Sequence, residues 1–359
     1  MNLLNLDEYE AAAREVLSQM AFDYIAGGAD DEVTIRENRA AFARLRLRPR
    51  VLAGVGTRDL QVTVLGQPIA FPVMVAPVAF HQLATPEGEC ATARAAGEAG
   101  TIMCVSTAAN YSLEDVATVA GGPLWFQLYC YKDRAITRAL VERAAAAGYR
   151  ALVLTADTPV IGRRERDIRN RFTLPPGMGW KNAETFGKRD LPQDAAGSGL
   201  AAYIATQQES DLTWADLDWL VSISPMPVLV KGVMTAEDTV LAAEHGATGV
   251  VVSNHGGRQL DTALASIDAL PQVVAAAAPA GLTVLLDGGV RRGTDVLKAL
   301  ALGARAVLVG RPVIWGLAVD GEAGARAVLD TLRAELDIAL ALAGCARAAD
   351  LHPGFVVGQ

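Results

Sequence analysis

The sequence has few cysteines for its length, and the four that it has are scattered. Cys90, Cys104, Cys130 and Cys345 form no C-x-x-C pair and have no histidine at metal-ligand spacing. These absences argue against a disulfide framework and a zinc site, and we predict no metal. Cys104 and Cys130 lie in apolar runs, which indicates small core residues in a protein of a reducing compartment.

The chain also lacks a basic surface, a signal peptide and a long apolar run. Its 359 residues have a net charge of −8, whereas nucleic-acid binders normally show a basic surface, so we expect no nucleic-acid partner. The N-terminus has no basic-then-apolar leader, and no apolar run approaches the ~18 residues of a membrane span. The C-terminal FVVGQ is not a peroxisomal address. We therefore expect a cytoplasmic protein without a membrane partner.

What the sequence does have is a repeated alternation from about residue 70 onward. A short apolar run is followed by a polar or Gly/Pro break, an Ala-rich amphipathic segment, a glycine and the next apolar run. The phrases EHGATGVVVSN and LGARAVLVG show the join, where glycine ends a helix and a Val/Leu strand begins. Uninterrupted apolar runs are typical of parallel strands that are buried on both faces.

Eight such runs can be counted, and each but the first follows a helical segment. They are residues 72–77, 101–106, 124–129, 151–157, 227–232, 249–254, 282–288 and 305–310. This pattern predicts an α/β protein with a (β/α)₈ TIM barrel. The alternative is a doubly wound open sheet, which normally has a Gly-rich dinucleotide-binding turn after its first strand. PVMVAPVAF contains no such turn.

Residues 1–70 precede the repeat and are predicted to hold two helices. Asn5 with Glu8 forms a plausible N-cap pair for the first helix, and Gly27-Gly28 is expected to stop it.

A second addition is the stretch 160–212, which follows the fourth predicted strand. It is too long for an ordinary loop, and loops of this length usually act as lids or are partly disordered. We expect the whole chain, 1–359, to form a single domain with its barrel over 71–345.

Polar residues, together with a few glycines, gather where the predicted strands end. They are Ser106, Gln127, Tyr129, Thr155, Asp157, Lys231, Asn254, His255, Asp287, Gly288, Gly289, Gly310 and Arg311. Because barrel enzymes place their sites at the C-terminal ends of the strands, this distribution predicts one polar site at that end. Lys231 has three interpretations there: a lysine that reaches the rim, a Schiff-base amine, or a fixed positive charge.

Two Gly- and Arg-containing turns follow the last two strands, in DGGVRRGTDV (287–296) and GRPVIW (310–315). Glycine lets backbone N–H groups approach an anion, a helix N-terminus adds positive charge, and arginine supplies a fork of donors. Barrel proteins commonly hold phosphate at these two strands. We therefore predict a phosphorylated ligand or cofactor.

Four segments together resemble one family. TADTPVIGRRERDIRNRF (155–172), LVKGV (229–233), SNHGGRQLD (253–261) and DGGVRRGTDVLKALALGARAVLVGRP (287–312) are similar to the FMN-dependent (S)-2-hydroxy acid oxidases, of the glycolate oxidase and L-lactate oxidase type. The similarity runs from about Leu6 to Cys345 with the spacing between motifs kept. It implies an FMN-binding barrel that oxidises a small 2-hydroxy acid.

The resemblance implies a role for six residues around the substrate. His255 matches the family's base and Asp157 the carboxylate beside it, which would stabilise the imidazolium. Arg164 and Arg258 match the guanidiniums that bind the substrate carboxylate. Tyr24 and Tyr129 match two phenols that hydrogen-bond the substrate. The remaining histidines, His81, His245 and His352, are interpreted as structural.

The resemblance also implies the cofactor contacts. Lys231 would stabilise the reduced flavin, an electrostatic role. The other expected contacts to the isoalloxazine are Ala76, Pro77, Val78, Ser106, Gln127, Thr155 and Ser253; those to the ribityl chain and phosphate are Asp287, Gly289, Arg291, Gly310 and Arg311.

One departure from the plant-type pattern bears on the substrate. Plant-type glycolate oxidases have a tryptophan where STAANYS places Ala108, so a smaller wall favours L-lactate or a larger acid over glycolate. Mandelate-type substrates stay possible, with Phe80 and His81 as further candidates to shape the pocket.

The implied reaction is oxidation of an (S)-2-hydroxy acid to the 2-oxo acid, with O₂ reduced to H₂O₂. The loop 160–212 is polar and Gly/Pro-rich, which favours an oxidase over a membrane-bound dehydrogenase that uses a quinone or another carrier.

Two mechanisms stay open: proton removal from the α-carbon, and hydride transfer. A class I aldolase, an FMN isomerase and a non-catalytic phosphate-binding barrel are the rival classes. By resemblance alone, a homo-oligomer of four or eight chains is expected.

Overall fold

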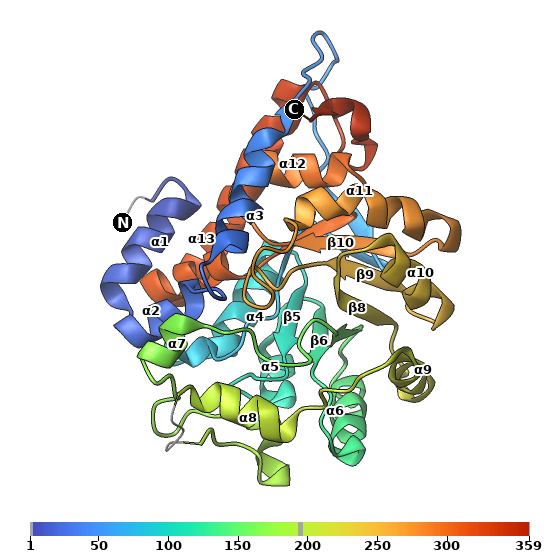
Figure 1. Cartoon of the computed structure of the whole chain (residues 1–359). Helices are drawn as coiled ribbons and strands as arrows, with labels where there is room; N and C mark the ends of the chain where they lie inside the picture. Colours follow the sequence, from blue (N-terminus) through green and yellow to red (C-terminus); the bar gives the residue numbers. More distant parts are fainter. Residues whose placement is uncertain (1–2, 193–196, 359) are drawn as a thin grey trace.

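A closed barrel of eight parallel strands forms the centre of the protein in a computed structural model, which describes residues 3–192 and 197–358 (Figure 1). Around the barrel the order is β10-β11-β4-β5-β6-β7-β8-β9. The strands are β4 Val73–Val75, β5 Met103–Ser106, β6 Leu124–Leu128, β7 Leu152–Thr155, β8 Val228–Val233, β9 Gly249–Val252, β10 Thr283–Asp287 and β11 Ala306–Val309. Each coincides with one of the eight apolar runs, with β8 extending one residue beyond its run, so the predicted TIM barrel is confirmed.

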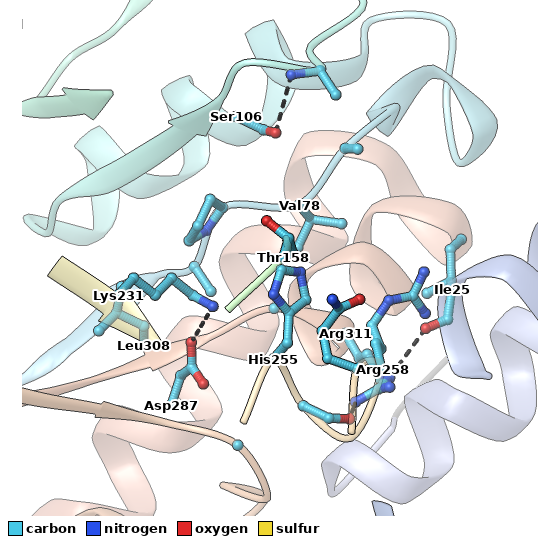
Figure 2. A pocket seen from close by; sticks show the side chains of 18 of the residues that line it. Ile25, Val78, Ser106, Thr158, Lys231, His255, Arg258, Asp287, Leu308 and Arg311 are labelled. Atoms are coloured by element: carbon cyan, nitrogen blue, oxygen red, sulfur yellow. Dashed lines mark hydrogen bonds and ion pairs between the residues drawn. The ribbon is translucent and has the colours of Figure 1, made fainter. Parts of the chain in front are cut away.

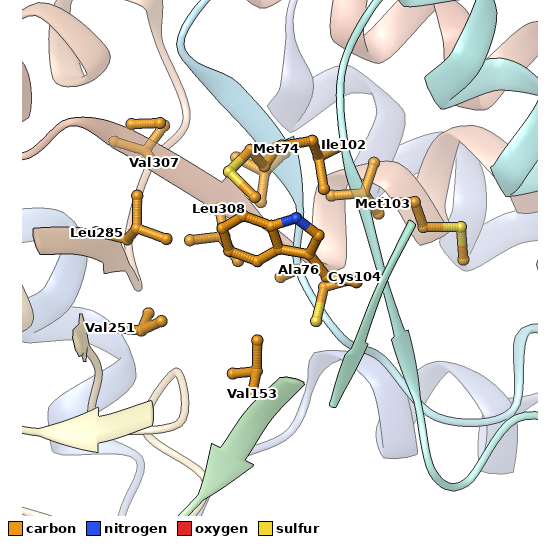
Figure 3. Close-up of a cluster of buried hydrophobic side chains, with 14 of the residues drawn as sticks. Met74, Ala76, Ile102, Met103, Cys104, Val153, Val251, Leu285, Val307 and Leu308 are labelled. Carbon is orange, nitrogen blue, oxygen red and sulfur yellow. The ribbon is translucent and has the colours of Figure 1, made fainter. Parts of the chain in front are cut away.

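Apolar side chains fill the barrel, and the strands are therefore buried along almost their whole length. Figure 3 shows Met74, Val153, Val251 and Leu285, from four different strands, converging on one interior cluster. Cys104 belongs to the same cluster, and burial raises the pKa of its thiol. All four cysteines are free and buried, which confirms the core positions predicted for Cys104 and Cys130.

Helices surround the barrel and connect successive strands (Figure 1). They are α4 Gly88–Ala99, α5 Leu113–Val119, α6 Arg134–Ala146, α9 Trp214–Ile223, α10 Ala236–Glu244, α11 Ser266–Ala277, α12 Gly293–Ala301 and α13 Arg311–Ala343. Gly100 shows how the chain leaves such a helix: it ends α4 with φ +74°, a conformation that favours glycine. Helix α13 is interrupted at Asp320 and Gly321, whose backbone is not helical.

The N-terminal segment differs from its prediction, because residues 3–70 hold three helices rather than two. They are α1 Leu6–Val16, α2 Gln19–Ala26 and α3 Val33–Arg44. The predicted cap is correct, since Asn5 Oδ1 accepts hydrogen bonds from the N–H groups of Asp7 and Glu8. The first helix, however, ends at Leu17 because Ser18 caps a new one, so Gly27 ends α2 instead.

Short strands and 3₁₀ turns complete the fold. Strands β2 and β3 form a hairpin, and β1, which follows α3, pairs with β12 near the C-terminus. The bounds are β1 Arg46–Leu47, β2 Val62–Val64, β3 Gln67–Ile69, β12 Val356–Val357, η1 His81–Leu83, η3 Ala278–Ala280, η4 Ala348–Asp350 and η5 Pro353–Phe355. Among the described residues, no helix is both long and apolar enough to cross a membrane.

The long segment after β7 has regular structure of its own. It contains α7 Glu165–Arg169, a 3₁₀ segment η2 Lys181–Phe186 and α8 Gly199–Gln207. Four residues of the predicted 160–212 loop, 193–196, lie outside the described residues. Tyr131, just after β6, forms a bridge with Gln208, so the end of this segment is attached to the barrel mouth.

Candidate active site

One pocket lies at the C-terminal ends of the barrel strands, and its empty space, including the part open to solvent, is about 1140 Å³ (Figure 2). Sixteen of the predicted site residues line it: Tyr24, Ala76, Pro77, Val78, Ser106, Ala108, Tyr129, Arg164, Lys231, His255, Arg258, Asp287, Gly289, Arg291, Gly310 and Arg311. The other four, Gln127, Thr155, Asp157 and Ser253, each hydrogen-bond a lining residue directly or through one neighbour. The structure therefore brings every predicted residue to one site.

His255 and Asp157 form a partly buried pair at this site. His255 Nδ1 lies 2.9 Å from Asp157 Oδ1, so the Nδ1–H donates and the other ring nitrogen is left free. Burial lowers the pKa of His255, despite the opposing effect of Asp157. Burial alone would raise the pKa of Asp157, but His255 and Lys231 outweigh it and hold it below its usual range. At neutral pH the pair is therefore a neutral imidazole beside a carboxylate.

The backbone at His255 has φ +56°, in the left-handed region that non-glycine residues rarely adopt. Two glycines with positive φ follow it, and the His255 N–H donates to Ser253 Oγ at 3.0 Å. This turn directs the imidazole into the pocket where strand β9 ends. Such strain persists only where the surrounding contacts hold it, and it is common at functional sites.

Lys231 is a fixed positive charge at the bottom of the pocket. Its ammonium donates to Ser253 Oγ at 2.9 Å and lies 3.4 Å from the carboxylate of Asp287, which the dashed line in Figure 2 marks. Burial would lower the pKa of Lys231, but Asp287 and Asp157 outweigh it and raise the pKa. The amine is thus protonated, which argues against the Schiff-base interpretation.

Three polar side chains from neighbouring strands form a chain of hydrogen bonds. Ser106 Oγ donates to Gln127 Oε1 at 3.1 Å, and Gln127 Nε2 donates to Thr155 Oγ1 at 2.9 Å. The Ala108 N–H donates to Ser106 Oγ at 3.1 Å. The register pairs Ser106 with Gln127, and Thr155 lies two residues beyond Val153, the partner of Gln127 on β7, so the three side chains present a row of polar atoms at the strand ends.

Arg164 and Arg258 face the pocket without a carboxylate partner. Arg258 Nη1 donates to the backbone carbonyls of Tyr24 and Gly27 at 2.7 and 2.9 Å. Burial, and then the nearby Arg258, lowers the pKa of Arg164 to about 10. Among the described residues, no carboxylate is within ion-pair distance of either guanidinium. A buried guanidinium and a partly buried one, both without an anionic partner, form a binding site for a small carboxylate.

Two phenols stand beside these arginines. Tyr24 stacks on Phe172 with ring centroids 4.2 Å apart, and the Arg258 guanidinium lies 5.0 Å above its ring. Burial raises the pKa of Tyr24, and it raises the pKa of Tyr129 to about 12, so both hydroxyls are protonated and able to donate. Tyr24 belongs to α2, and the N-terminal segment therefore closes one side of the pocket.

Arg311 and Arg291 line the side of the pocket next to Arg258, because Arg258 and Arg311 both donate to the carbonyl of Gly27. Arg311 donates to the carbonyls of Ile25, Gly256 and Gly27 at 2.9–3.0 Å and has no acidic partner among the described residues. Burial lowers the pKa of Arg311 to about 9 and that of Arg291 to about 10. The Arg291 Nε is buried without a hydrogen-bond acceptor.

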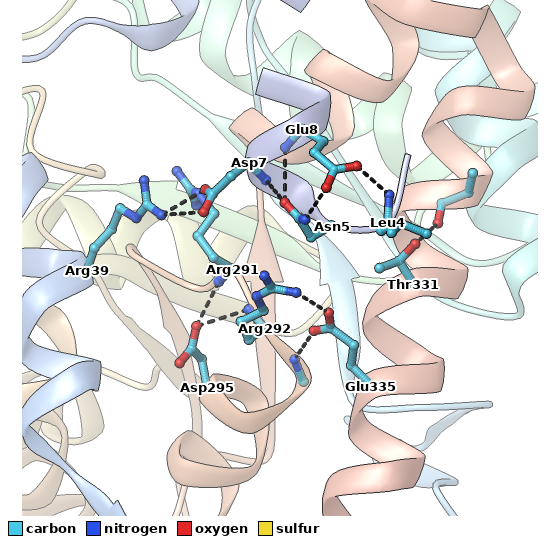
Figure 4. Close-up of polar contacts among 12 residues, drawn as sticks. Leu4, Asn5, Asp7, Glu8, Arg39, Arg291, Arg292, Asp295, Thr331 and Glu335 are labelled. Atoms are coloured by element: carbon cyan, nitrogen blue, oxygen red, sulfur yellow. Dashed lines mark hydrogen bonds and ion pairs between the residues drawn. The ribbon is translucent and has the colours of Figure 1, made fainter. Parts of the chain in front are cut away.

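The glycine turn after β10 completes this side. Gly289 has φ +84°, and a Cβ there would lie 2.1 Å from the carbonyl oxygen of Asn38, so only glycine fits. Asp295 accepts hydrogen bonds from the N–H groups of Arg291 and Arg292 at 3.0 Å, which fixes the turn (Figure 4). Bare backbone beside two uncompensated guanidiniums fits a phosphate dianion, which would neutralise them and satisfy Arg291 Nε.

The sequence reasoning missed the wall that the long segment contributes. Ile161, Trp180, Leu200, Ile204 and Gln208 also line the pocket. The signal for them was weak, because the aromatic residues of this segment are sparse and fit a loop equally well. Gln259 was missed too: its Nε2 donates to the carbonyls of Asp157 and Val160 at 2.9 and 2.8 Å.

The other three histidines have structural partners. His81 Nδ1 lies 2.9 Å from Thr92 Oγ1, His245 pairs with Asp218, and His352 accepts from the Gly354 N–H. Neither Phe80 nor His81 lines the pocket directly. Within residues 3–192 and 197–358, no group of His, Cys, Asp and Glu side chains is arranged to hold a metal ion.

Comparison with known proteins agrees with this site. Residues 13–357 match the family model described as FMN-dependent dehydrogenase. The chain is 54% identical to an L-lactate oxidase of Nostoc sp. over 98% of both chains, and 53% identical to glycolate oxidase 5 of Oryza sativa subsp. japonica over 99% of this chain and 96% of that protein. A crystal structure of mandelate oxidase with (S)-4-hydroxymandelic acid is 41% identical, with TM-score 0.94 over 99% of both chains. A chimera of (S)-mandelate dehydrogenase is 42% identical, with TM-score 0.92 over the whole of both chains. The chain therefore belongs to the FMN-dependent dehydrogenase family, and FMN is its cofactor.

Proposed function

We propose that this protein oxidises an (S)-2-hydroxy acid, with L-lactate as the best candidate, to the 2-oxo acid and reduces O₂ to H₂O₂. One observation supports this most strongly: the His255–Asp157 pair opens into the same pocket as two guanidiniums without acidic partners. A base beside a carboxylate-binding site is what removal of a proton from a hydroxy acid requires.

FMN, held at the C-terminal ends of the barrel strands, would supply the two-electron redox chemistry between the substrate and O₂. Its phosphate would be held by Gly289, Arg291, Gly310 and Arg311. The residues proposed to face the rest of the cofactor are Ala76, Pro77, Val78, Ser106, Gln127, Thr155, Lys231, Ser253 and Asp287. Lys231 adds a permanent positive charge near the ring, and such a charge stabilises an anionic reduced form.

The substrate carboxylate is proposed to bind Arg164 and Arg258, because both are permanently charged and lack another anion. Tyr24 and Tyr129 donate hydrogen bonds to the substrate's carboxylate and to its hydroxyl or keto oxygen. These four contacts fix the acid so that its α-carbon faces His255. Holding the substrate in this orientation lowers the entropic part of the activation barrier.

His255 is proposed to accept the proton that leaves the substrate. Its Nδ1–H is committed to Asp157, so the free Nε2 lone pair is the acceptor. The Asp157 carboxylate then stabilises the imidazolium that results. The same free nitrogen serves whether the proton comes from the α-carbon or from the hydroxyl, so this geometry is compatible with both mechanisms.

The choice of L-lactate rests on the small Ala108 in the pocket and on the similarity to a lactate oxidase. Glycolate and mandelate are the alternatives, because oxidases named for both are close relatives. A dehydrogenase that passes electrons to a quinone or another carrier is the second candidate, since (S)-mandelate dehydrogenase has the same fold.

Two measurements on purified protein test the proposal. The flavin absorbance of the FMN-loaded protein should bleach when L-lactate is added without O₂, and admission of O₂ should restore it with one H₂O₂ per turnover. Comparison of kcat/KM for L-lactate, glycolate and (S)-mandelate tests the substrate. A tenfold advantage for glycolate would contradict the choice of L-lactate, and bleaching without peroxide release would indicate a dehydrogenase. A cytoplasmic location and a homo-oligomer of four or eight chains stay predictions.

A further inference from the structure

Trp180 forms part of the pocket wall, although it comes from the long segment between β7 and β8. Its side chain is buried, with 1% exposed. The indole packs on Tyr203 with ring centroids 4.5 Å apart, and on Phe80 and Tyr129 at 6.1 and 6.4 Å. A tryptophan surrounded by three aromatic rings has a fixed position, because interiors are close-packed.

The backbone on both sides of Trp180 is held against the segment that follows β5. The Lys181 N–H donates to the carbonyl of Ala109 at 3.0 Å, and Asn110 Nδ2 donates to the carbonyl of Gly179 at 3.2 Å. The Trp180 N–H itself donates to the carbonyl of Arg189 at 2.8 Å. This part of the long segment is therefore fixed to the chain next to Ala108.

Ala108 and Trp180 belong to the same wall of the pocket. Both line it, and Phe80 connects them: its N–H donates to the carbonyl of Ala108 at 3.2 Å, and its ring packs on Trp180. The side chain of Ala108 is 1% exposed, so its small size does not open the pocket to solvent. Ala108 and Trp180 therefore line one pocket and share Phe80 as a neighbour.

The neighbouring part of the wall is apolar. Leu200 and Ile204 of α8 line the pocket together with Ile161. Arg164 is the charged lining residue that the long segment contributes, and the other charged lining residues come from the strand ends and the loops that follow them. An uncharged alkyl group is therefore favoured next to Trp180, whereas a second carboxylate would be buried there without a cation.

We infer that Trp180 sets the upper size limit for the group on the substrate's α-carbon. The substrate class is then the short 2-hydroxy acids with a small uncharged alkyl group, and acids with an aryl group are disfavoured by the indole. This inference rests on the proposed function and names the substrate class of the same site. Trp180 acts as a specificity-determining residue, because the proton transfer depends on His255.

The test is a graded pair of variants, Trp180→Phe and Trp180→Leu, in the FMN-loaded enzyme. The measured quantity is the ratio of kcat/KM for (S)-mandelate to that for L-lactate. We expect the ratio to rise with each step and to reach at least tenfold above the parent in Trp180→Leu, since pocket volume discriminates by about 1–3 kcal/mol per methylene. A general loss of activity cancels in this ratio, so a merely structural role would not move it.

Trp214→Phe is the matched control, because Trp214 stacks on His245 at 5.8 Å and does not line the pocket. Its ratio should equal that of the parent. If Trp180→Leu is not recovered with flavin, Trp180→Phe decides, with an expected rise of at least twofold. An unchanged ratio in an active Trp180 variant overturns the inference alone. A parent that oxidises no 2-hydroxy acid at all overturns the proposed function instead.

Discussion

Asn38 and Asn254 donate hydrogen bonds to each other through their side-chain amides, with N···O distances of 2.9 and 2.8 Å. Both are buried, and Asn254 directly precedes His255 in the chain. Asn38 Oδ1 also accepts from the Ser266 N–H at 3.2 Å, and the carbonyl of Asn38 closes the space beside Gly289. Helix α3 therefore supports both the histidine turn and the glycine turn.

Removal of this amide should loosen both turns. Asn38→Ala leaves buried hydrogen-bonding groups without partners, so we expect the free energy of unfolding of the flavin-loaded protein to fall by about 1–3 kcal/mol. Urea denaturation followed by flavin release measures it. Gln61→Ala is the control, because Gln61 is exposed and should change stability by less than about 0.5 kcal/mol. Equal stability in the two variants would show that the amide pair is not a support.

Arg311→Met should weaken FMN binding. The guanidinium has no acidic partner among the described residues, so a bound phosphate would be the anion that neutralises its charge. We expect the Kd for FMN to rise by about 10–100-fold, as loss of a charge-assisted hydrogen bond predicts. Arg305→Met changes an arginine at the other end of the same strand and should leave the Kd unchanged. An Arg311→Met protein with unchanged Kd contradicts the proposed phosphate site.

The pH dependence follows from the His255–Asp157 pair. Because burial lowers the pKa of His255, the base is neutral at pH 7 and becomes protonated only on acidification below its ordinary value of about 6.5. The pKa of Asp157 is also lowered, so this carboxylate stays ionised over that range. We expect kcat/KM to be flat from pH 7 to 8 and to fall on the acid side with an apparent pKa below about 6.5. An acid limb with an apparent pKa of about 8 would exclude His255 as the group that it reports.

Gly289→Ala should reduce flavin binding by more than the strain of its left-handed backbone explains. Both Gly289 and Gly281 have positive φ, +84° and +65°, but a Cβ at Gly281 meets nothing within 4 Å. Each alanine costs about 1–2 kcal/mol for the left-handed backbone, and only Gly289→Ala also collides with Asn38. We expect FMN to copurify with Gly281→Ala and not with Gly289→Ala. Equal flavin content in the two variants would show that the close approach at Gly289 is not needed.

The barrel and the site were predictable because their signals are local. A strand that is buried on both faces appears in the sequence as an apolar run. The polar residues near its C-terminal end lie at the barrel mouth, so Lys231 and Asp287 could be placed before any contact was known. The family motifs extended this to residues such as Tyr24, which belongs to the N-terminal helices.

What could not be predicted depends on contacts between distant segments. The break at Ser18 was missed because an N-cap serine inside an apolar stretch is a weak signal beside a Gly-Gly pair. The position of Trp180 depends on hydrogen bonds to Ala109 and Asn110, which are far away in the sequence. The role of Asn254 depends in the same way on Asn38, 216 residues away.

Anaerobic flavin reduction by L-lactate in the FMN-loaded His255→Gln variant tests the central claim most directly. Glutamine keeps much of the bulk but cannot accept the proton, so the variant should retain its yellow flavin spectrum. We predict that bleaching is about 10²–10⁴-fold slower than in the parent, as the loss of a general base requires. Bleaching at the parent's rate would contradict the assignment of His255 as the base, and with it the proposed mechanism.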